Sequence, residues 1–377
     1  MAKKRMLYFT GITVGIILVI VLALVLFYND DEVVVLAYNQ IEDKMTEAAK
    51  NYTQNKPSIL PNTDDEEVIL TVNDLVTAGY MSPLNEYLGS SNSKVCTGEV
   101  KIVLTSETYK YTSMLDCGEN YKTKLLYEVI LGNVVSSGSG LYQMIDNRFT
   151  YANYANDSDN IKYIFRGEKP KNYLKLGDNY WLIVEVDSDN NLLLIRNDTF
   201  SNGYNYVWDD RYNTSADNFF GINDFGLSRI HDNLINYYAD IADNVKDVML
   251  PMSLCIGSRG IEDSASDYGK ECNKKIENEY VGLMNASQFV AGSIDKDCAS
   301  VTSISCGNYN YLTSGKNAWW LLTSDKDTTY SVYFVAGSSL MLSQANKGCA
   351  IRPMILVSSS LIFESGDGSK NNPYIVR

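Results

Sequence analysis

The feature that most constrains this chain is a long uncharged segment close to its N terminus. Lys3, Lys4 and Arg5 precede an apolar run over residues 6–28, and acidic residues follow at positions 30–32. As a helix, that run would rise about 34 Å, enough to cross a bilayer core of about 30 Å. Because basic residues stay in the cytoplasm, we expect a cytoplasmic tail at 1–5, a transmembrane helix at 6–28 and extracellular residues beyond it.

A cleaved signal peptide is the alternative interpretation of this segment. A signal peptide has a shorter apolar core, and a small-residue cleavage site follows it closely. The residues at the end of the run, Leu26, Phe27 and Tyr28, offer no such site. The sequence therefore favours an uncleaved anchor, which would make the chain a single-pass protein of the cell membrane.

Charge and length limit what the extracellular part can be. The 377 residues suit two domains and an anchor, and the formal net charge is −14. Nucleic-acid binding requires a basic surface, so nucleic acid is not expected as a partner. An acidic surface also disfavours electrostatic docking to anionic lipid, so contact with the membrane is expected through the anchor alone.

A helix and a small module follow the anchor. Apolar residues recur at helical spacing through Val34, Tyr38, Ile41, Met45, Ala48 and Tyr52. This seam predicts a stalk helix over 29–56, and it favours packing on the protein's own next domain over a coiled coil. A small α+β module is predicted at 57–124, with a capping box at Thr71 and Asp74 and a hairpin of strands 99–105 and 108–115.

Seven cysteines outside the membrane indicate an oxidising compartment and disulfides. Pairing Thr105 with Thr108 in the hairpin brings Cys96 opposite Cys117, so these two are predicted to be bonded. Proximity along the chain suggests two more pairs, Cys255–Cys272 and Cys298–Cys306. Cys349 is left over as a buried thiol, or pairs with Cys255 or Cys272 instead. With one His and no C-x-x-C motif, neither a metal site nor a cofactor is expected.

Residues 125–377 are predicted to form one domain of mixed short strands and two helices. Helical patterns follow Lys124 and Ser228, and a further helix is expected over 240–250, ahead of Pro251. Strands are expected at 180–186, 192–196, 319–323, 330–335, 350–357 and 374–376. The "DSDNN" turn between the first two is similar to part of a calcium loop, but it lacks the terminal acid and favours a hairpin turn.

Several stretches of this domain resemble a domain of unknown function in surface proteins of Gram-positive gut bacteria. They include "SSGSGLY", "GLSRIHDNLINYY", "YVGLMNASQF", "NAWWLLTS", "CAIRPMILV" and "SGDGSKNNPYIV". That family is similar to the C-type-lectin-like fold in its sulfatase-modifying-factor variety. The resemblance implies helices beside a small sheet, paired chain ends, and long loops that form a binding face. The catalytic cysteine pair of the sulfatase-modifying enzymes has no match in this sequence.

The residues before this domain resemble the module that precedes it in related chains, which often begin with a pilin-like helix. The matching stretches are "VNDLVTAGYM", "CTGEVKIV" and "YKYTSMLDC". The prepilin cleavage signature is missing, which puts assembly into a pilus in doubt. A pilin-like or cell-envelope assembly subunit is therefore an alternative role.

The functional prediction is a lectin-like binding module without catalytic activity that recognises a glycan or a surface protein. Trp319 and Trp320 are adjacent, so on a strand they would point to opposite faces. One interpretation makes both of them core residues of a two-layer domain. The functional interpretation places one of them beside Trp208 on an exposed aromatic face, since exposed aromatic rings anchor sugars and protein partners. The lone His231 is expected to be solvated and to lack a nucleophile. An extracellular hydrolase that uses unassigned carboxylates is the alternative.

Overall fold

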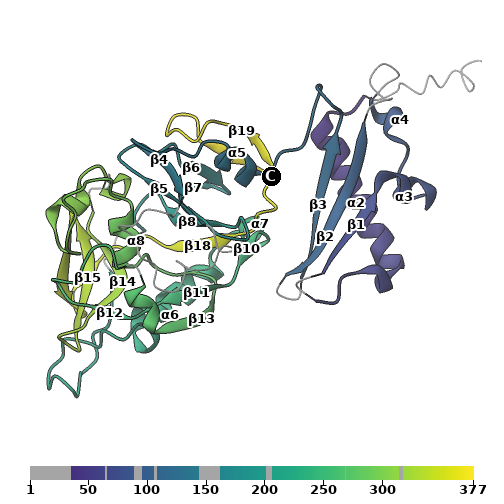
Figure 1. Cartoon of the computed structure of the whole chain (residues 1–377). Coiled ribbons are helices and arrows are strands. Elements are labelled where there is room, and N and C mark those ends of the chain that lie inside the picture. The colour runs from purple at the N-terminus through teal and green to yellow at the C-terminus, as the bar shows by residue number, and fades with distance from the viewer. Residues whose placement is uncertain are drawn as a thin grey trace, which may run out of the picture. The chain divides into compact units, whose positions relative to one another are not determined.

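The computed structural model describes residues 35–63, 66–88, 96–105, 108–143, 162–200, 206–267, 269–313 and 317–377. They form a mixed α+β chain that is rich in strands and carries three disulfides (Figure 1). The chain divides into two compact units. The first contains the described residues up to Val103 and Tyr109–Lys122, and the second contains Leu104–Thr108 and Thr123–Arg377.

Within the described ranges, no helix is long and apolar enough to cross a membrane. The expected tail at 1–5 and transmembrane helix at 6–28 lie outside those ranges. The anchor therefore stays a prediction from the sequence.

The first unit is a helix packed on a three-stranded sheet of order β1-β2-β3. Its elements are α2 (Tyr38–Asn55), β1 (Glu67–Thr71), α3 (Val72–Thr77), α4 (Leu84–Leu88), β2 (Thr97–Thr105) and β3 (Thr108–Asp116). Ile41 and Met45 of α2 are 0% exposed in a core shared with Val100 and Ile102 of β2. The helix expected over 29–56 begins at Tyr38 among the described residues, and its apolar seam is core of this unit, not a free stalk.

Local chemistry explains two features of the first unit. At the start of α3, Thr71 Oγ1 accepts the Asp74 N–H at 3.2 Å, and Asp74 Oδ2 accepts the Thr71 N–H at 2.9 Å, which confirms the predicted capping box. Cys96 and Cys117 are disulfide-bonded, as predicted from the strand register of the hairpin. The bond joins the two outer ends of the β2–β3 pair.

The second unit has four helices in its described part, compared with two in the predicted fold class and three in the helical patterns of the sequence. They are α5 (Leu126–Leu131), α6 (Arg229–Ala239), α7 (Asp243–Lys246) and α8 (Ala286–Ala291). The predicted helix over 240–250 was too long, because Met249 and Leu250 instead pair with Val357 and Leu356 as a strand. Ser228 precedes α6 as expected, but its hydroxyl donates to the Phe225 carbonyl at 2.7 Å and does not cap the helix.

Two larger sheets and two strand pairs complete the second unit (Figure 1). The larger sheet has the order β10-β18-β8-β7-β6-β20-β19, and β4 and β5 join it beside β7. Its strands are β4 (Gly140–Gln143), β5 (Tyr163–Arg166), β6 (Tyr173–Leu176), β7 (Asn179–Val186), β8 (Leu192–Arg196), β10 (Met249–Leu250), β18 (Met354–Val357), β19 (Phe363–Ser365) and β20 (Tyr374–Val376). The β7–β8 pairing is antiparallel, so the strands predicted around "DSDNN" form the expected hairpin.

The second sheet has the order β12-β14-β15-β16, and the pairs β11–β13 and β9–β17 lie outside both sheets. These strands are β9 (Tyr206–Val207), β11 (Met252–Cys255), β12 (Ser258–Arg259), β13 (Lys275–Glu279), β14 (Trp319–Asp325), β15 (Ser331–Ala336), β16 (Ser339–Gln344) and β17 (Gly348–Cys349). Side chains from both sheets and from α8 share one continuous apolar core.

The two ends of the second unit are hydrogen-bonded to each other. The Leu126 N–H donates to the Leu361 carbonyl at 2.8 Å, and the Phe363 N–H donates to the Lys124 carbonyl at 2.9 Å. Figure 1 shows α5, the first helix of this unit, beside β19 near the C terminus. The chain therefore enters and leaves this unit at one place.

Candidate functional site

Trp208, Trp319 and Trp320, the candidates for an exposed aromatic face, are all buried. Trp208 and Trp320 are 0% exposed and Trp319 is 2% exposed. Both faces of β14 are covered, so the alternation of Trp319 and Trp320 directs both rings into the core. Trp319 packs against Phe289 of α8, and Trp320 packs against Trp208. The interpretation that placed Trp208 and one of Trp319 and Trp320 on an exposed face was wrong, and the interpretation that placed Trp319 and Trp320 in the core is confirmed.

The second unit contains a cavity of about 290 Å³ beside the end of β7, β11 and the start of α8. Its apolar lining comes from Leu193, Pro251, Met252, Leu254, Leu283, Leu322, Met354 and Leu356. Its polar lining comes from Lys162, Glu185, Asp187, Ser253, Asn285, Ser287 and Gln288. The disulfide Cys255–Cys272, whose pairing was expected from proximity, completes the wall. A hollow with apolar surface and several polar groups is the usual form of a small-molecule site.

A capping box at the start of α8 fixes two of the polar groups. Asn285 Oδ1 accepts the Gln288 N–H at 2.8 Å, and Gln288 Oε1 accepts the Asn285 N–H at 3.0 Å. Because both amide oxygens are used in this way, each side chain presents its amide nitrogen as the remaining donor. The cavity wall therefore carries two oriented N–H₂ groups.

Two carboxyl groups reach the cavity from β7 and the turn that follows it. Glu185 accepts from Lys162 Nζ at 2.6 Å, in an ion pair whose side chains are 10% and 19% exposed. Asp187 Oδ1 accepts the N–H groups of Asp189 and Asn191 at 2.9 and 2.8 Å. Burial raises the pKa of Asp187, and the charge of Glu185 acts in the same direction, while the hydrogen bonds from Asn191 and Asp189 oppose it.

A buried ionic network supports the wall at Ser287. The Ser287 hydroxyl donates to Glu271 Oε2 at 2.5 Å, and its N–H donates to Glu271 Oε1 at 3.1 Å. Arg259 lies 3.5 Å from the same carboxylate, and both side chains are 0% exposed. Burial raises the pKa of Glu271, and the charge of Arg259 and the bonds from Ser287 oppose that rise. Because Glu271 precedes Cys272, the Cys255–Cys272 disulfide also holds this network in place.

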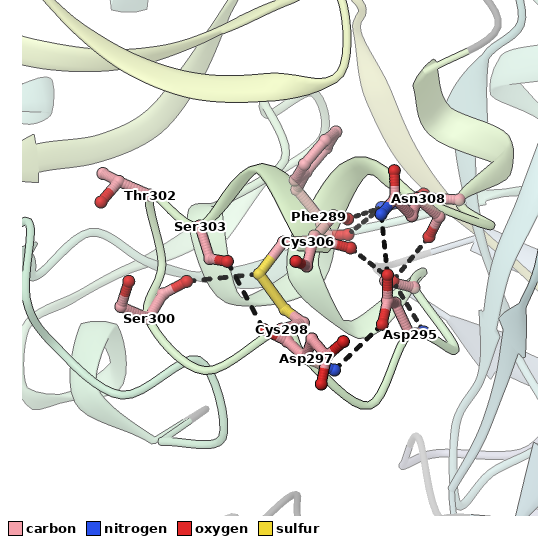
Figure 2. Close-up of a disulfide and its surroundings, with 12 residues drawn as sticks. Phe289, Asp295, Asp297, Cys298, Ser300, Thr302, Ser303, Cys306 and Asn308 are labelled. Atoms are coloured by element: carbon pink, nitrogen blue, oxygen red, sulfur yellow. Dashed lines mark hydrogen bonds between the residues drawn. A yellow bond between two sulfur atoms is a disulfide. The ribbon is translucent and has the colours of Figure 1, made fainter.

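The third disulfide, Cys298–Cys306, confirms the last of the predicted pairs. Figure 2 shows it in the loop that follows α8, with Phe289 of that helix nearby. Asp295 Oδ2 accepts from Asn308 Nδ2 at 2.8 Å, and Asp295 Oδ1 accepts the Asp297 N–H at 2.9 Å. These contacts stiffen the loop, and neither cysteine lines the cavity.

Two residues that could take part in nucleophilic chemistry are Cys349, which is buried, and His231, which is hydrogen-bonded to Glu279. Cys349 is a buried free thiol, and burial raises its pKa to about 11, which keeps it protonated and unreactive. His231 Nε2 lies 2.9 Å from Glu279 Oε1, and the two side chains are 15% and 16% exposed. The prediction of a solvated His231 was wrong, because Phe225 and Glu279 cover it.

An exposed aromatic pair does exist, at positions that the sequence did not single out. Tyr212 is 42% exposed and Phe219 is 69% exposed, and their ring centroids lie 5.0 Å apart. The loop of residues 211–221 is held in place by the buried Asn213. Its Nδ2 donates to the carbonyls of Gly221 and Thr329 at 2.8 and 3.0 Å. Neither ring lines the cavity described above, so the pair is a separate surface feature.

Across the described ranges, no group of three or more His, Cys, Asp or Glu side chains could hold a metal ion. Comparisons with protein families, with curated proteins and with solved structures find no match to this chain. The cavity is therefore the strongest basis on which to infer a function.

Proposed function

We propose that this chain is a membrane-anchored bacterial surface protein whose second unit has a C-type-lectin-like fold and binds a glycan in the cavity. The hydrogen-bonded ends of the second unit and its long connecting segments support the proposed fold. In the N-terminal segment, basic residues precede the apolar run and acidic residues follow it, and this order supports the anchor. Three disulfides support an extracytoplasmic location.

The composition of the cavity wall is the observation that carries the glycan proposal. Asn285, Gln288 and Lys162 offer donors, and Glu185 and Asp187 offer acceptors, beside a wall of leucine and methionine side chains. A sugar hydroxyl both donates and accepts hydrogen bonds, and the C–H face of a sugar ring is apolar. At about 290 Å³, the cavity is at the lower end of the range for ligand sites, which suits one sugar ring rather than a long chain segment.

A glycan array probed with the full-length chain tests this proposal. Ser253 is exposed on β11 and lines the cavity, so Ser253→Trp would fill the opening without disturbing the core. We expect wild type to bind specific glycans and Ser253→Trp to lose them. Ser215→Trp is the matched control, because Ser215 is exposed and does not line the cavity. Unchanged binding by Ser253→Trp would refute the cavity as the site.

A hydrolase is the second candidate, and the two carboxyl groups in one cavity favour it. Asp187 has a raised pKa, as the general acid of a glycosidase does. However, Asp187 accepts hydrogen bonds from its own turn, and Glu185 is paired with Lys162. Release of reducing sugar from a bound glycan, abolished by Glu185→Gln, would support hydrolysis over binding alone.

A pilin-like assembly subunit is the remaining alternative for the first unit. The packing of α2 on a three-stranded antiparallel sheet favours it, since such a module could present its helix to other copies. Chemical cross-linking of the full-length chain in cells would test it. A ladder of regularly spaced oligomers would support assembly, and a single monomer band would refute it.

A further inference from the structure

The charged groups of the cavity are unequal in number. Lys162 supplies one positive charge, and its ammonium group is 2.6 Å from Glu185 Oε1. Asp187 supplies a second carboxyl group, so the ionised side chains of the described lining residues carry one more negative than positive charge. The Arg259–Glu271 pair behind Ser287 is balanced and does not change this sum.

Asp187 forms no ion pair within the part of the chain that the structure describes. Its hydrogen-bond donors are neutral, namely the N–H groups of Asp189 and Asn191 and the side-chain amide of Asn191, at 2.9, 2.8 and 3.2 Å. Burial raises the pKa of its carboxyl group, which is the direction expected when no cation compensates the lost hydration. A partly buried carboxylate in this position would be stabilised by a ligand that brings a positive charge.

We propose that the cavity selects an amino sugar with a free, protonated amine, and that Asp187 is the residue that receives the ammonium group. The inference rests on the proposed glycan-binding function and names the class of sugar. The ammonium group would donate to Asp187 Oδ2, whose one hydrogen bond with the described residues is the 3.2 Å contact with Asn191 Nδ2. The ring hydroxyls would bond to the amides of Asn285 and Gln288, which do not discriminate between charged and neutral sugars.

Matched sugars separate this preference from sugar binding in general. We would titrate the full-length chain in detergent with a hexose, its 2-amino-2-deoxy form and its N-acetylated form, in both gluco and galacto configurations. Calorimetry at about pH 6 keeps the free amine protonated. Wild type should bind the free amino sugar at least about tenfold more tightly than the hexose and the N-acetyl sugar, since a factor of ten corresponds to about 1.4 kcal/mol.

Two carboxyl groups of one turn provide the variant and its control. Asp187→Asn keeps an oxygen that can accept the two turn N–H groups and removes the charge. It should abolish the preference, measured as the ratio of the affinities for the amino sugar and the neutral hexose, which should fall to about one. Asp189→Asn removes the same charge from an exposed residue that does not line the cavity, and it should keep the preference. Thermal unfolding of each variant establishes that it is folded.

A third variant keeps the test decisive if Asp187→Asn does not fold. Lys162→Gln removes the cation paired with Glu185 and makes the cavity more negative, so it should increase the preference for the amino sugar. Equal binding of the hexose and the amino sugar by wild type would overturn the inference and leave glycan binding intact. Binding of no sugar in the set would overturn both.

Discussion

Trp208 and Trp320 meet edge to face in the core of the second unit, with ring centroids 6.1 Å apart and an interplanar angle of 67°. Both side chains are 0% exposed. The Trp320 indole N–H donates to the Tyr206 carbonyl at 2.8 Å, which joins β14 to β9. This pair links the loop-rich middle of the chain to the second sheet, so it has a structural role where a ligand contact was expected.

Truncation of Trp208 should therefore destabilise the protein. Trp208→Ala removes a fully buried ring, and we expect the free energy of unfolding to fall by about 3–5 kcal/mol, as for other buried aromatic truncations. Phe219→Ala is the control, because Phe219 is 69% exposed, and it should change the free energy by less than about 0.5 kcal/mol. Urea unfolding followed by tryptophan fluorescence measures both. Equal effects of the two variants would contradict the assignment of Trp208 to the core.

The Arg259–Glu271 pair should be sensitive to loss of one partner. Glu271→Ala leaves the guanidinium of Arg259 buried at 0% exposure without its carboxylate, and we expect a loss of about 3–5 kcal/mol in urea unfolding. The double variant Arg259→Met with Glu271→Leu should lose less, because it leaves no uncompensated charge. Glu277→Ala, at an exposed position of β13, is the control. A double variant less stable than Glu271→Ala would show that the network contributes more than charge compensation.

Asp263 should give the stability of the second unit a dependence on pH. Burial acts to raise the pKa of Asp263, but Lys270 at 2.7 Å, the Gly260 N–H and Lys326 together lower it to about 2. A carboxyl pKa that is lower in the folded chain contributes stability above the unfolded pKa of about 4, and that contribution is lost as the pH falls towards 2.

Asp263→Asn should therefore cost about 1–2 kcal/mol at neutral pH, allowing for solvent screening of the two partly exposed lysine side chains. The difference from wild type should fall to roughly half by about pH 3. Urea unfolding of both proteins across that range measures it. A difference that stays constant with pH would mean that the Asn change acts through packing and not through charge.

Cys349 should resist modification in the folded chain. Its pKa of about 11 lies about two units above the ordinary value, so its thiolate at about pH 8 is roughly a hundredfold scarcer than that of an exposed cysteine. Alkylation followed by non-reducing peptide mapping should label Cys349 only after unfolding, with the other six cysteines in disulfides. Rapid labelling of the native protein would contradict the buried position of this thiol.

Local patterns in the sequence predicted the features that depend on neighbouring residues. The strand register of the first hairpin identified the Cys96–Cys117 disulfide. The turn-forming residues of "DSDNN" identified the β7–β8 hairpin. Both depend on strand alternation and on turns, which a sequence displays directly. The capping box at Thr71 is of the same kind.

Features that depend on distant residues could not be predicted in this way. The alternation of Trp319 and Trp320 suggested one exposed ring, but α8 and β9 cover the two faces of their strand. The cavity combines Lys162, Glu185 and Asn285, whose proximity follows from the packing of β7 beside the start of α8. Asn285 and Gln288 had one usable signal, the capping-box spacing in "NASQ", which marks a helix start but not a cavity.

Hydrogen–deuterium exchange of the full-length chain, with and without a glycan that the array identifies, tests the central claim most directly. The cavity account predicts slower exchange on binding within segments 251–255 and 283–288, which supply lining residues of the cavity. It predicts no change at residues 211–221, which carry the exposed Tyr212–Phe219 pair. Protection confined to that aromatic loop, or found only in the first unit, would contradict the claim that the cavity is the binding site.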